Sequence, residues 1–329
     1  MPNLETTYLG IKLKNPLLAA SSGLTGSLEK IKELKEAGIG AVVLKSIFEE
    51  QINNEVGAML SEGAQNMEYP EAEDYIRSYL RDNSISRQTD LVRRVKDETG
   101  LPVIASVNCV AGEEWTSFTG ILEEAGADAI ELNIFYLPVD RLQSSDQVEQ
   151  LYLNVVKSVR KHTRIPVSVK IGSHFTNIVA MADKLKANGA QGIVMFNRFY
   201  EPDIDLDKLE LTASEVFSSP AELRHGLRWT GLVSSKVPNL EIASATGIHN
   251  GEGVFKLLLA GAQVTQLCST LYLNGTGVVS TILEELTAFM RKWNFRHIED
   301  FRGRLSYRNL AEPMMYERSQ FMKYYSGRK

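Results

Sequence analysis

One short pattern recurs four times along this chain of 329 residues, at 36–46, 124–133, 187–197 and 259–269. Each copy joins the end of a helical segment, a glycine and an apolar run that ends in polar residues: EAGIGAVVLKS, EAGADAIELN, ANGAQGIVMFN and LAGAQVTQLCS. A glycine at that point suits the left-handed residue that closes a helix, and a short apolar run suits a strand buried on both faces. The pattern therefore predicts helices that each lead into a buried parallel strand.

Four further apolar runs bring the predicted strands to eight: residues 17–21, 103–107, 167–171 and 241–246. Helical periodicity separates the strands and is clearest at 27–37, 148–162 and 179–188. Eight alternating units without a long linker favour a (β/α)8 TIM barrel that forms a single domain over residues 1–329. An open doubly wound sheet is the alternative.

Several segments lie outside simple barrel units. Residues 1–16 precede the first strand, and within them 6–16 read as a hairpin that plugs the bottom of the barrel. Residues 293–329 form a C-terminal helical extension, in which 302–329 should pack as a terminal helix. Segments 46–88 and 198–219 exceed ordinary strand-to-helix loops, so we expect both to cover the active-site face.

Charge and cysteine content exclude several classes of function. The net charge of −5 and the pI of about 5.7 argue against a general nucleic-acid or membrane-surface binder. Cys109 and Cys268 are too few for a disulfide framework, and no spacing of His, Cys and carboxylate residues indicates a metal site. No segment resembles a signal peptide or a membrane span. We expect a cytoplasmic protein that acts on a small molecule as a homodimer.

Polar residues cluster where the predicted strands end, which is where barrels carry their chemistry. These strand-end residues are Ser21, Ser22, Lys45, Ser46, Asn108, Cys109, Asn133, Lys170, Asn197, Thr246, Gly247, Ser269 and Thr270. Buried cations and amides need partners, so two lysines and three amides around one cavity predict a binding site. Residues 245–253 and 268–270 follow the last two strands, and loops there commonly hold a phosphate.

The order of these motifs resembles the dihydroorotate dehydrogenase family, which is similar in fold and flavin site to the pyrimidine-reducing domain of dihydropyrimidine dehydrogenase. The likeness covers residues 3–292 and rests on NPLLAASS, VVLKS, IASVNC, ELN, PVSVK, the asparagine of MFNR, ATGI and GAQVTQLCST. It implies an FMN across the barrel mouth. Residues lining the isoalloxazine would be Ala20, Ser21, Lys45 and Ser46, and those at the phosphate Gly247, Ser269 and Thr270. Asn133 would also bind the cofactor.

The same resemblance assigns roles in catalysis. Lys170 would lie at the N1–C2 carbonyl edge of the flavin, where a cation stabilises the negative charge of the reduced ring. Asn66, Asn133 and Asn197 would hydrogen-bond the planar amide edges of orotate, and Lys45 would line the reacting rings.

The chain departs from the family pattern at several positions. The phosphate loop has Thr246 where the family has the first of two glycines, Cys268 replaces a further glycine, and Pro138 replaces an asparagine. The catalytic cysteine falls at Tyr136, and residues 131–143 contain no Cys or Ser. Tyr136 is therefore the candidate base. One alternative is a stacking or space-filling role for Phe135 and Tyr136. Another is that Cys109 or His174 is the base.

The resemblance implies an FMN-dependent oxidoreductase of pyrimidine metabolism that oxidises dihydroorotate. In that reaction hydride passes from a substrate carbon to flavin N5 while a loop base removes the neighbouring proton. Three alternatives remain: an FMN enzyme for a different cyclic amide, a flavin-bound protein that has lost the reaction and serves as a binding module, and a flavin-free barrel in which Lys170 forms a Schiff base with a sugar phosphate.

Overall fold

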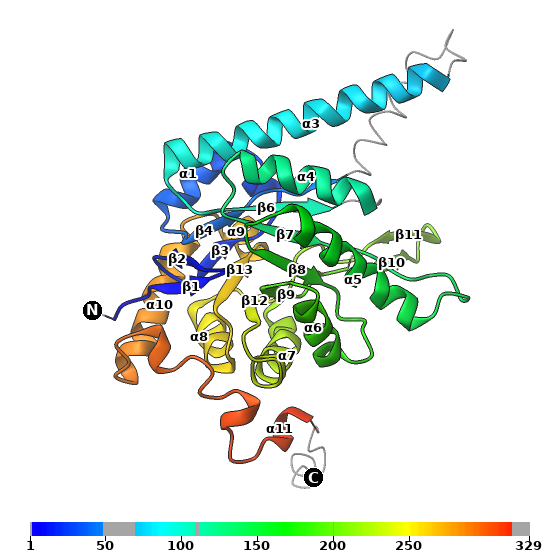
Figure 1. Ribbon diagram of the computed structural model, residues 1–329. Helices are drawn as coiled ribbons and strands as arrows, with labels where there is room; N and C mark the ends of the chain where they lie inside the picture. Colours follow the sequence, from blue (N-terminus) through cyan, green and yellow to red (C-terminus); the bar gives the residue numbers. More distant parts are fainter. Residues whose placement is uncertain (1, 49–69, 109–111, 200, 318–329) are drawn as a thin grey trace.

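Eight parallel strands close into a barrel surrounded by helices in the computed structural model, which describes residues 2–48, 70–108, 112–199 and 201–317 (Figure 1). The barrel strands are β3 (Leu17–Ala19), β4 (Ala41–Val43), β6 (Val103–Asn108), β7 (Ala129–Asn133), β8 (Val167–Ile171), β9 (Gly192–Met195), β12 (Glu241–Ala245) and β13 (Val264–Leu267). Closure comes from the pairing of β4 with β6, in addition to that of β3 with β13. The short β5 (Ile47–Phe48) extends the pairing of β6. The predicted (β/α)8 barrel is confirmed, and the open sheet is wrong.

Helices follow the strands as the periodicity predicts. They are α1 (Leu28–Glu36), α3 (Pro70–Thr99), α4 (Gly112–Glu124), α5 (Ser145–His162), α6 (Ile178–Ala187), α7 (Leu223–Lys236), α8 (Gly251–Ala260), α9 (Ser269–Asn274) and α10 (Val278–Lys292). The glycines of the recurring pattern all have left-handed φ angles: 101° at Gly38, 98° at Gly126, 107° at Gly189 and 116° at Gly261. Each helix in the pattern thus ends as predicted, because glycine adopts this backbone at little cost.

The alternation of side chains along each strand divides the apolar residues into two cores. Ile130 and Leu132 of β7 face the helices and belong to the larger core, whereas Ala129 faces the barrel interior. The interior core combines small and branched side chains: Leu18, Ala41, Val43, Ile104, Ala129, Val194, Ala243, Ala245 and Val264. Both faces of the strands are therefore buried, which explains their continuous apolar sequences.

An N-terminal hairpin plugs the barrel, as predicted from its sequence. Its strands β1 (Thr6–Tyr8) and β2 (Ile11–Leu13) pair in antiparallel fashion, and Tyr8 and Leu9 are buried in the interior core. A Cβ added to Gly192, the first residue of β9, would lie 2.8 Å from Leu9 Cδ2 and 3.2 Å from the Tyr8 hydroxyl. The plug therefore fills the amino-terminal end of the barrel, opposite the predicted site.

The longer segments differ from simple loops. Residues 70–88 of the 46–88 segment are helical, because α3 begins at Pro70, and residues 49–69 lie outside the described part. Residues 198–219 contain the hairpin of β10 (Pro202–Asp205) and β11 (Glu210–Ala213), which projects from the barrel in Figure 1. In the extension, residues 302–317 form only the short turns η4 (Tyr307–Asn309) and α11 (Met314–Glu317), so a continuous terminal helix is absent from that range. Gly303 with a φ of 68° and Pro313 interrupt helical geometry there.

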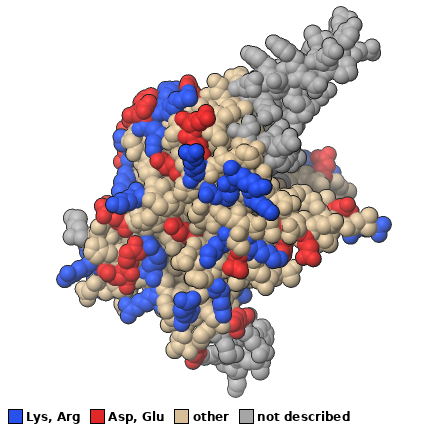
Figure 2. All heavy atoms as spheres, viewed as in Figure 1, with Lys and Arg blue, Asp and Glu red and all other residues tan. Residues whose placement is uncertain are grey.

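The surface carries mixed charge on the face shown in Figure 2, where Lys and Arg lie among Asp and Glu. This face therefore lacks the large single-sign area that binds nucleic acid. Within the described residues, no helix has the length and apolarity needed to cross a membrane.

Candidate active site

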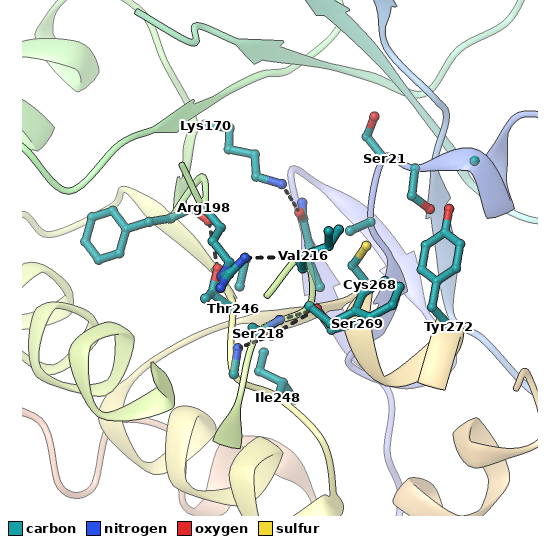
Figure 3. Close-up of a pocket in the computed structure, with 18 residues that line it drawn as sticks. Ser21, Lys170, Arg198, Val216, Ser218, Thr246, Ile248, Cys268, Ser269 and Tyr272 are labelled. Atoms are coloured by element: carbon teal, nitrogen blue, oxygen red, sulfur yellow. Dashed lines mark hydrogen bonds between the residues drawn. The ribbon is translucent and has the colours of Figure 1, made fainter. Parts of the chain in front are cut away.

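A cavity of about 520 Å³ opens at the carboxyl ends of the barrel strands (Figure 3). Side chains from the ends of β3, β8, β9, β12 and β13 line it together with residues 216–218 of the segment after β11. Predicted site residues that line the cavity are Ala20, Ser21, Ser22, Lys170, Thr246, Gly247 and Ser269. The structure therefore brings these predicted residues together around one opening.

Among the residues that the structure describes, two cations and no carboxylate line this cavity. Lys170 extends from β8, and its Nζ lies 3.4 Å from Oε1 of Gln266. Arg198, just after β9, pairs with Glu222 at 3.0 Å and donates to the carbonyl of Val216 at 2.9 Å. Lys170 therefore lies beside a neutral amide, so an anion entering the cavity would meet net positive charge.

The predicted phosphate loops converge on one hydroxyl, that of Ser218. Its Oγ accepts from the backbone N–H of Gly247 at 3.1 Å and donates to Ser269 Oγ at 3.0 Å. Its backbone N–H donates to the same Ser269 oxygen at 2.9 Å, and His249 Nε2 lies 2.8 Å from its carbonyl. The groups suited to a phosphate thus surround an oxygen atom supplied by the chain itself.

Thr246 and Gly247 both adopt left-handed backbone, with φ angles of 71° and 76°. This conformation is uncommon for a β-branched residue. The Thr246 hydroxyl donates to the carbonyl of Phe196 at 3.1 Å, which links the ends of β12 and β9. The loop therefore holds a threonine in left-handed backbone, which has a conformational cost that a glycine at this position would avoid.

The serine and lysine residues at the ends of β3 and β4 separate into two groups. Ser46 is buried beneath the cavity, with its Oγ 2.7 Å from Ser106 Oγ and 3.1 Å from Ser21 Oγ. Lys45 is exposed, and its Cδ lies 3.3 Å from the position of a Cβ on Gly26. The structure thus directs the Lys45 stem over the turn at Gly26, and Lys45 is not among the cavity-lining residues.

Two of the three predicted substrate asparagines, Asn133 and Asn197, lie together. Asn197 Nδ2 donates to Asn133 Oδ1 at 2.8 Å, and Asn133 is in register with Lys170 on the adjacent strand. Thr270 is buried behind the loop, where its hydroxyl donates to the carbonyl of His249 at 3.4 Å. Asn66 and Cys109 lie outside the described residues.

The two aromatic residues of the loop after β7, Phe135 and Tyr136, differ in exposure and in the groups they contact. The Tyr136 hydroxyl donates to Gln143 Oε1 at 2.7 Å, and the Tyr136 ring packs against the larger core. Phe135 is exposed and packs against Phe199, with 4.4 Å between ring centroids and the two rings tilted by 32°. His174 makes an edge contact with Phe199 at 5.5 Å, and burial lowers its pKa. These residues form an aromatic rim at the ends of β7, β8 and β9.

Sequence reasoning missed Arg198 and three further polar residues of the cavity and its floor. Gln266 lies one residue before the end of β13, and its Nε2 donates to Glu131 Oε2 at 2.6 Å. Glu131 lies two residues before the end of β7 and is completely buried. Their positions share the period-two register of Asn133 and Lys170, which was the available signal. Ser218 is on a long loop, and no local pattern in the sequence indicates its position.

Comparisons with known proteins agree over almost the whole chain. A family model described as dihydroorotate dehydrogenase matches residues 3–290. The catalytic subunit of dihydroorotate dehydrogenase B (NAD(+)) from Thermoplasma volcanium is 29% identical over 319 residues, covering 92% of this chain and 98% of that protein. The protein of the same description from Methanocaldococcus jannaschii is 26% identical, with 88% and 94% covered. Dihydroorotate dehydrogenase A (fumarate) from Limosilactobacillus reuteri is 29% identical, with 78% and 84% covered. The matched range includes every strand of the barrel.

Proposed function

Because the chain belongs to the dihydroorotate dehydrogenase family of flavin-dependent oxidoreductases, we propose that it binds FMN and oxidises dihydroorotate. The observation that carries this proposal is the cavity at the barrel mouth, whose described lining residues include Lys170 and Arg198 and no carboxylate. The earlier resemblance to this family is confirmed by the match over residues 3–290. Membership also favours flavin chemistry over a Schiff base at Lys170.

The residues present fit a flavin mononucleotide. Its single phosphate matches the loops after β12 and β13, where the Gly247 N–H and the Ser269 hydroxyl now contact Ser218. A phosphate oxygen would make the same contacts once Ser218 turns aside, because both groups accept from a backbone N–H. Ala20 and Ser21 provide the opposite wall of the cavity.

A bound flavin supplies the two-electron acceptor, and the remaining tasks fall to side chains. Lys170 would hold positive charge near a bound flavin and would so stabilise the negative charge of its reduced form. The bond from Asn197 to Asn133 fixes both amides while using one donor and one acceptor of the pair. Their other polar atoms are then available to the amide edges of a flat ring.

Tyr136 is the proposed base. It lies on the loop that follows Asn133, and its hydroxyl donates a hydrogen bond to Gln143. A phenol accepts a proton only after ionising, so we expect dihydroorotate oxidation to be slow at neutral pH and to accelerate as pH rises. If Tyr136 is not the base, Phe135 and Tyr136 serve as ring-stacking surfaces.

We also propose a cytoplasmic homodimer. Ile204, Leu206, Leu209 and Leu211 of the β10–β11 hairpin are each more than half exposed, and a second copy would cover them. Analytical ultracentrifugation tests this directly, and a monomer at micromolar concentration would contradict it.

Anaerobic mixing of the purified protein with a panel of dihydropyrimidines tests the main proposal. We expect mass spectrometry to find released FMN, and dihydroorotate to bleach the flavin absorbance faster than other ring substrates do. FAD, or no flavin after reconstitution, would overturn the cofactor assignment. Reduction by another cyclic amide alone would overturn the substrate.

A further inference from the structure

Three polar side chains cross the barrel interior beneath the cavity. Glu131 of β7 and Gln266 of β13 are 0% and 2% exposed, and Gln266 Nε2 donates to Glu131 Oε2 at 2.6 Å. The other end of the same amide, Oε1, lies 3.4 Å from Lys170 Nζ on β8. One glutamine thus connects a buried carboxyl group to the cation at the cavity.

The carboxyl group is held in this place at a cost. Burial raises the pKa of Glu131, and Lys170 and the Gln266 bond offset only part of that effect. Within the described residues its Oε1 has no hydrogen-bond partner. Apolar side chains such as Ala129 and Val264 occupy the next layer of the interior, so the barrel does not need an acid there for packing.

The arrangement gives the Gln266 amide a fixed direction. A carboxylate only accepts, so it selects the NH₂ end of the amide and leaves the carbonyl end facing Lys170. A neutral carbonyl can orient an ammonium without cancelling its charge, whereas a carboxylate in direct contact would compensate that charge. The acid is one side chain away from Lys170, and the glutamine lies between them.

We infer that Gln266 is a positioning residue, which Glu131 holds in place so that the Lys170 ammonium faces the cavity with its charge available to bound flavin. This inference rests on the proposed FMN site and extends it. It concerns a property of the protein-bound flavin, namely how much more tightly the site holds the reduced than the oxidised form.

The decisive variant exchanges the two side chains, as Glu131→Gln with Gln266→Glu in one protein. Net charge and side-chain size are kept, but a carboxylate now contacts Lys170. The readouts are the dissociation constant of FMN and the two-electron midpoint potential of the bound flavin. We expect at least a tenfold loss of affinity for reduced relative to oxidised FMN, which equals about 30 mV toward negative potential for a two-electron couple.

Two further comparisons separate positioning from general damage. Gln266→Glu alone should lower the potential, and it should add no further shift in a Lys170→Met background, because its effect passes through Lys170. Ser244→Ala is the matched control, since Ser244 is also buried and bonds Thr230 at 2.7 Å, away from this group. It should reduce stability and leave the potential unchanged. Gln266→Leu provides the test if the exchanged protein does not fold, and should also lower the potential.

The outcomes distinguish this inference from the proposed function. FMN binding with a wild-type potential in the exchanged variant, or an equal shift from Gln266→Glu with and without Lys170, would overturn the positioning role. Failure of the wild-type protein to bind FMN would instead overturn the proposed cofactor.

Discussion

Replacing Gly247 with alanine should destabilise the proposed phosphate loop through two separable effects. Gly247 has a φ of 76°, and left-handed backbone costs an alanine about 1–2 kcal/mol. The new Cβ would also lie 2.3 Å from the backbone nitrogen of Leu223 and 2.9 Å from its Cα. Those atoms start α7 and cannot turn aside as a side chain does, and overpacking typically adds about 1–3 kcal/mol. We expect a total loss of about 2–5 kcal/mol in unfolding free energy.

Gly100, the residue after α3, offers a control with a similar φ. Its φ is 67°, and an added Cβ would meet no atom within 4 Å. Gly100→Ala should therefore lose only the conformational part, about 1–2 kcal/mol. Urea unfolding of both variants gives the free energies from the midpoints and slopes.

The contrast between the two alanine variants isolates the contact with Leu223. FMN affinity should fall in Gly247→Ala alone, because the displaced loop carries the N–H that now binds Ser218. Equal free-energy losses in the two variants would refute the close approach of Gly247 to the start of α7.

Three other perturbations test the site. Lys170→Ala should fold and yet hold reduced FMN about tenfold less tightly, on the scale of one charged hydrogen bond. Lys170→Arg should restore only part of that affinity, since its planar guanidinium differs from an ammonium. An unchanged midpoint potential in Lys170→Ala would remove Lys170 from the site. In Tyr136→Phe, the rate of dihydroorotate oxidation should no longer rise with pH, and at high pH it should be about 10²–10⁴-fold lower than in the wild type. An unchanged pH profile would show that the phenol is not the base. Because burial raises the pKa of Glu131 above its ordinary 4.5, its stabilising contribution is complete below pH 4.5 and is lost as pH rises through the folded pKa. The free energy of unfolding should therefore fall more steeply with pH in the wild type than in Glu131→Gln, by up to about 1.4 kcal/mol per pH unit, and parallel profiles in urea titrations would contradict this.

Local sequence was enough to predict the barrel because its signals do not depend on distant contacts. Gly38, Gly126, Gly189 and Gly261 mark helix ends through their own backbone preference, and the strands that follow are apolar on both faces. The plug was predictable for the same reason, since a hairpin ahead of the first strand has few other places to pack. In the extension, the many aromatic and basic residues suggested a helix, but Gly303 and Pro313 limited it to short turns.

The site was only partly predictable, because strand position determines where a side chain starts and not where it ends. Lys45 and Lys170 both follow from strand-end reasoning, yet the Lys45 stem lies over Gly26 while Lys170 lines the cavity. Ser218 reaches the phosphate loops from a long segment, so only the tertiary fold reveals it. Gln266 could have been predicted, because a polar side chain that points into the barrel from an apolar strand needs a hydrogen-bond partner in the interior.

The plug hairpin has a consequence for the order in which this protein folds. The first strand to leave the ribosome bonds with almost the last, since Thr6 Oγ1 donates to the carbonyl of Gln263 and β3 pairs with β13. Contacts of such long sequence separation form slowly, because a very large loop must close before they contribute. Neighbouring units such as β6–β7 and β7–β8 need no such closure. We therefore expect pulsed hydrogen exchange during refolding to show that the amides of β7 become protected before those of β3. The residues synthesised earliest would then fold only after the C-terminal part of the barrel is available. Simultaneous protection would show that the barrel closes in a single step.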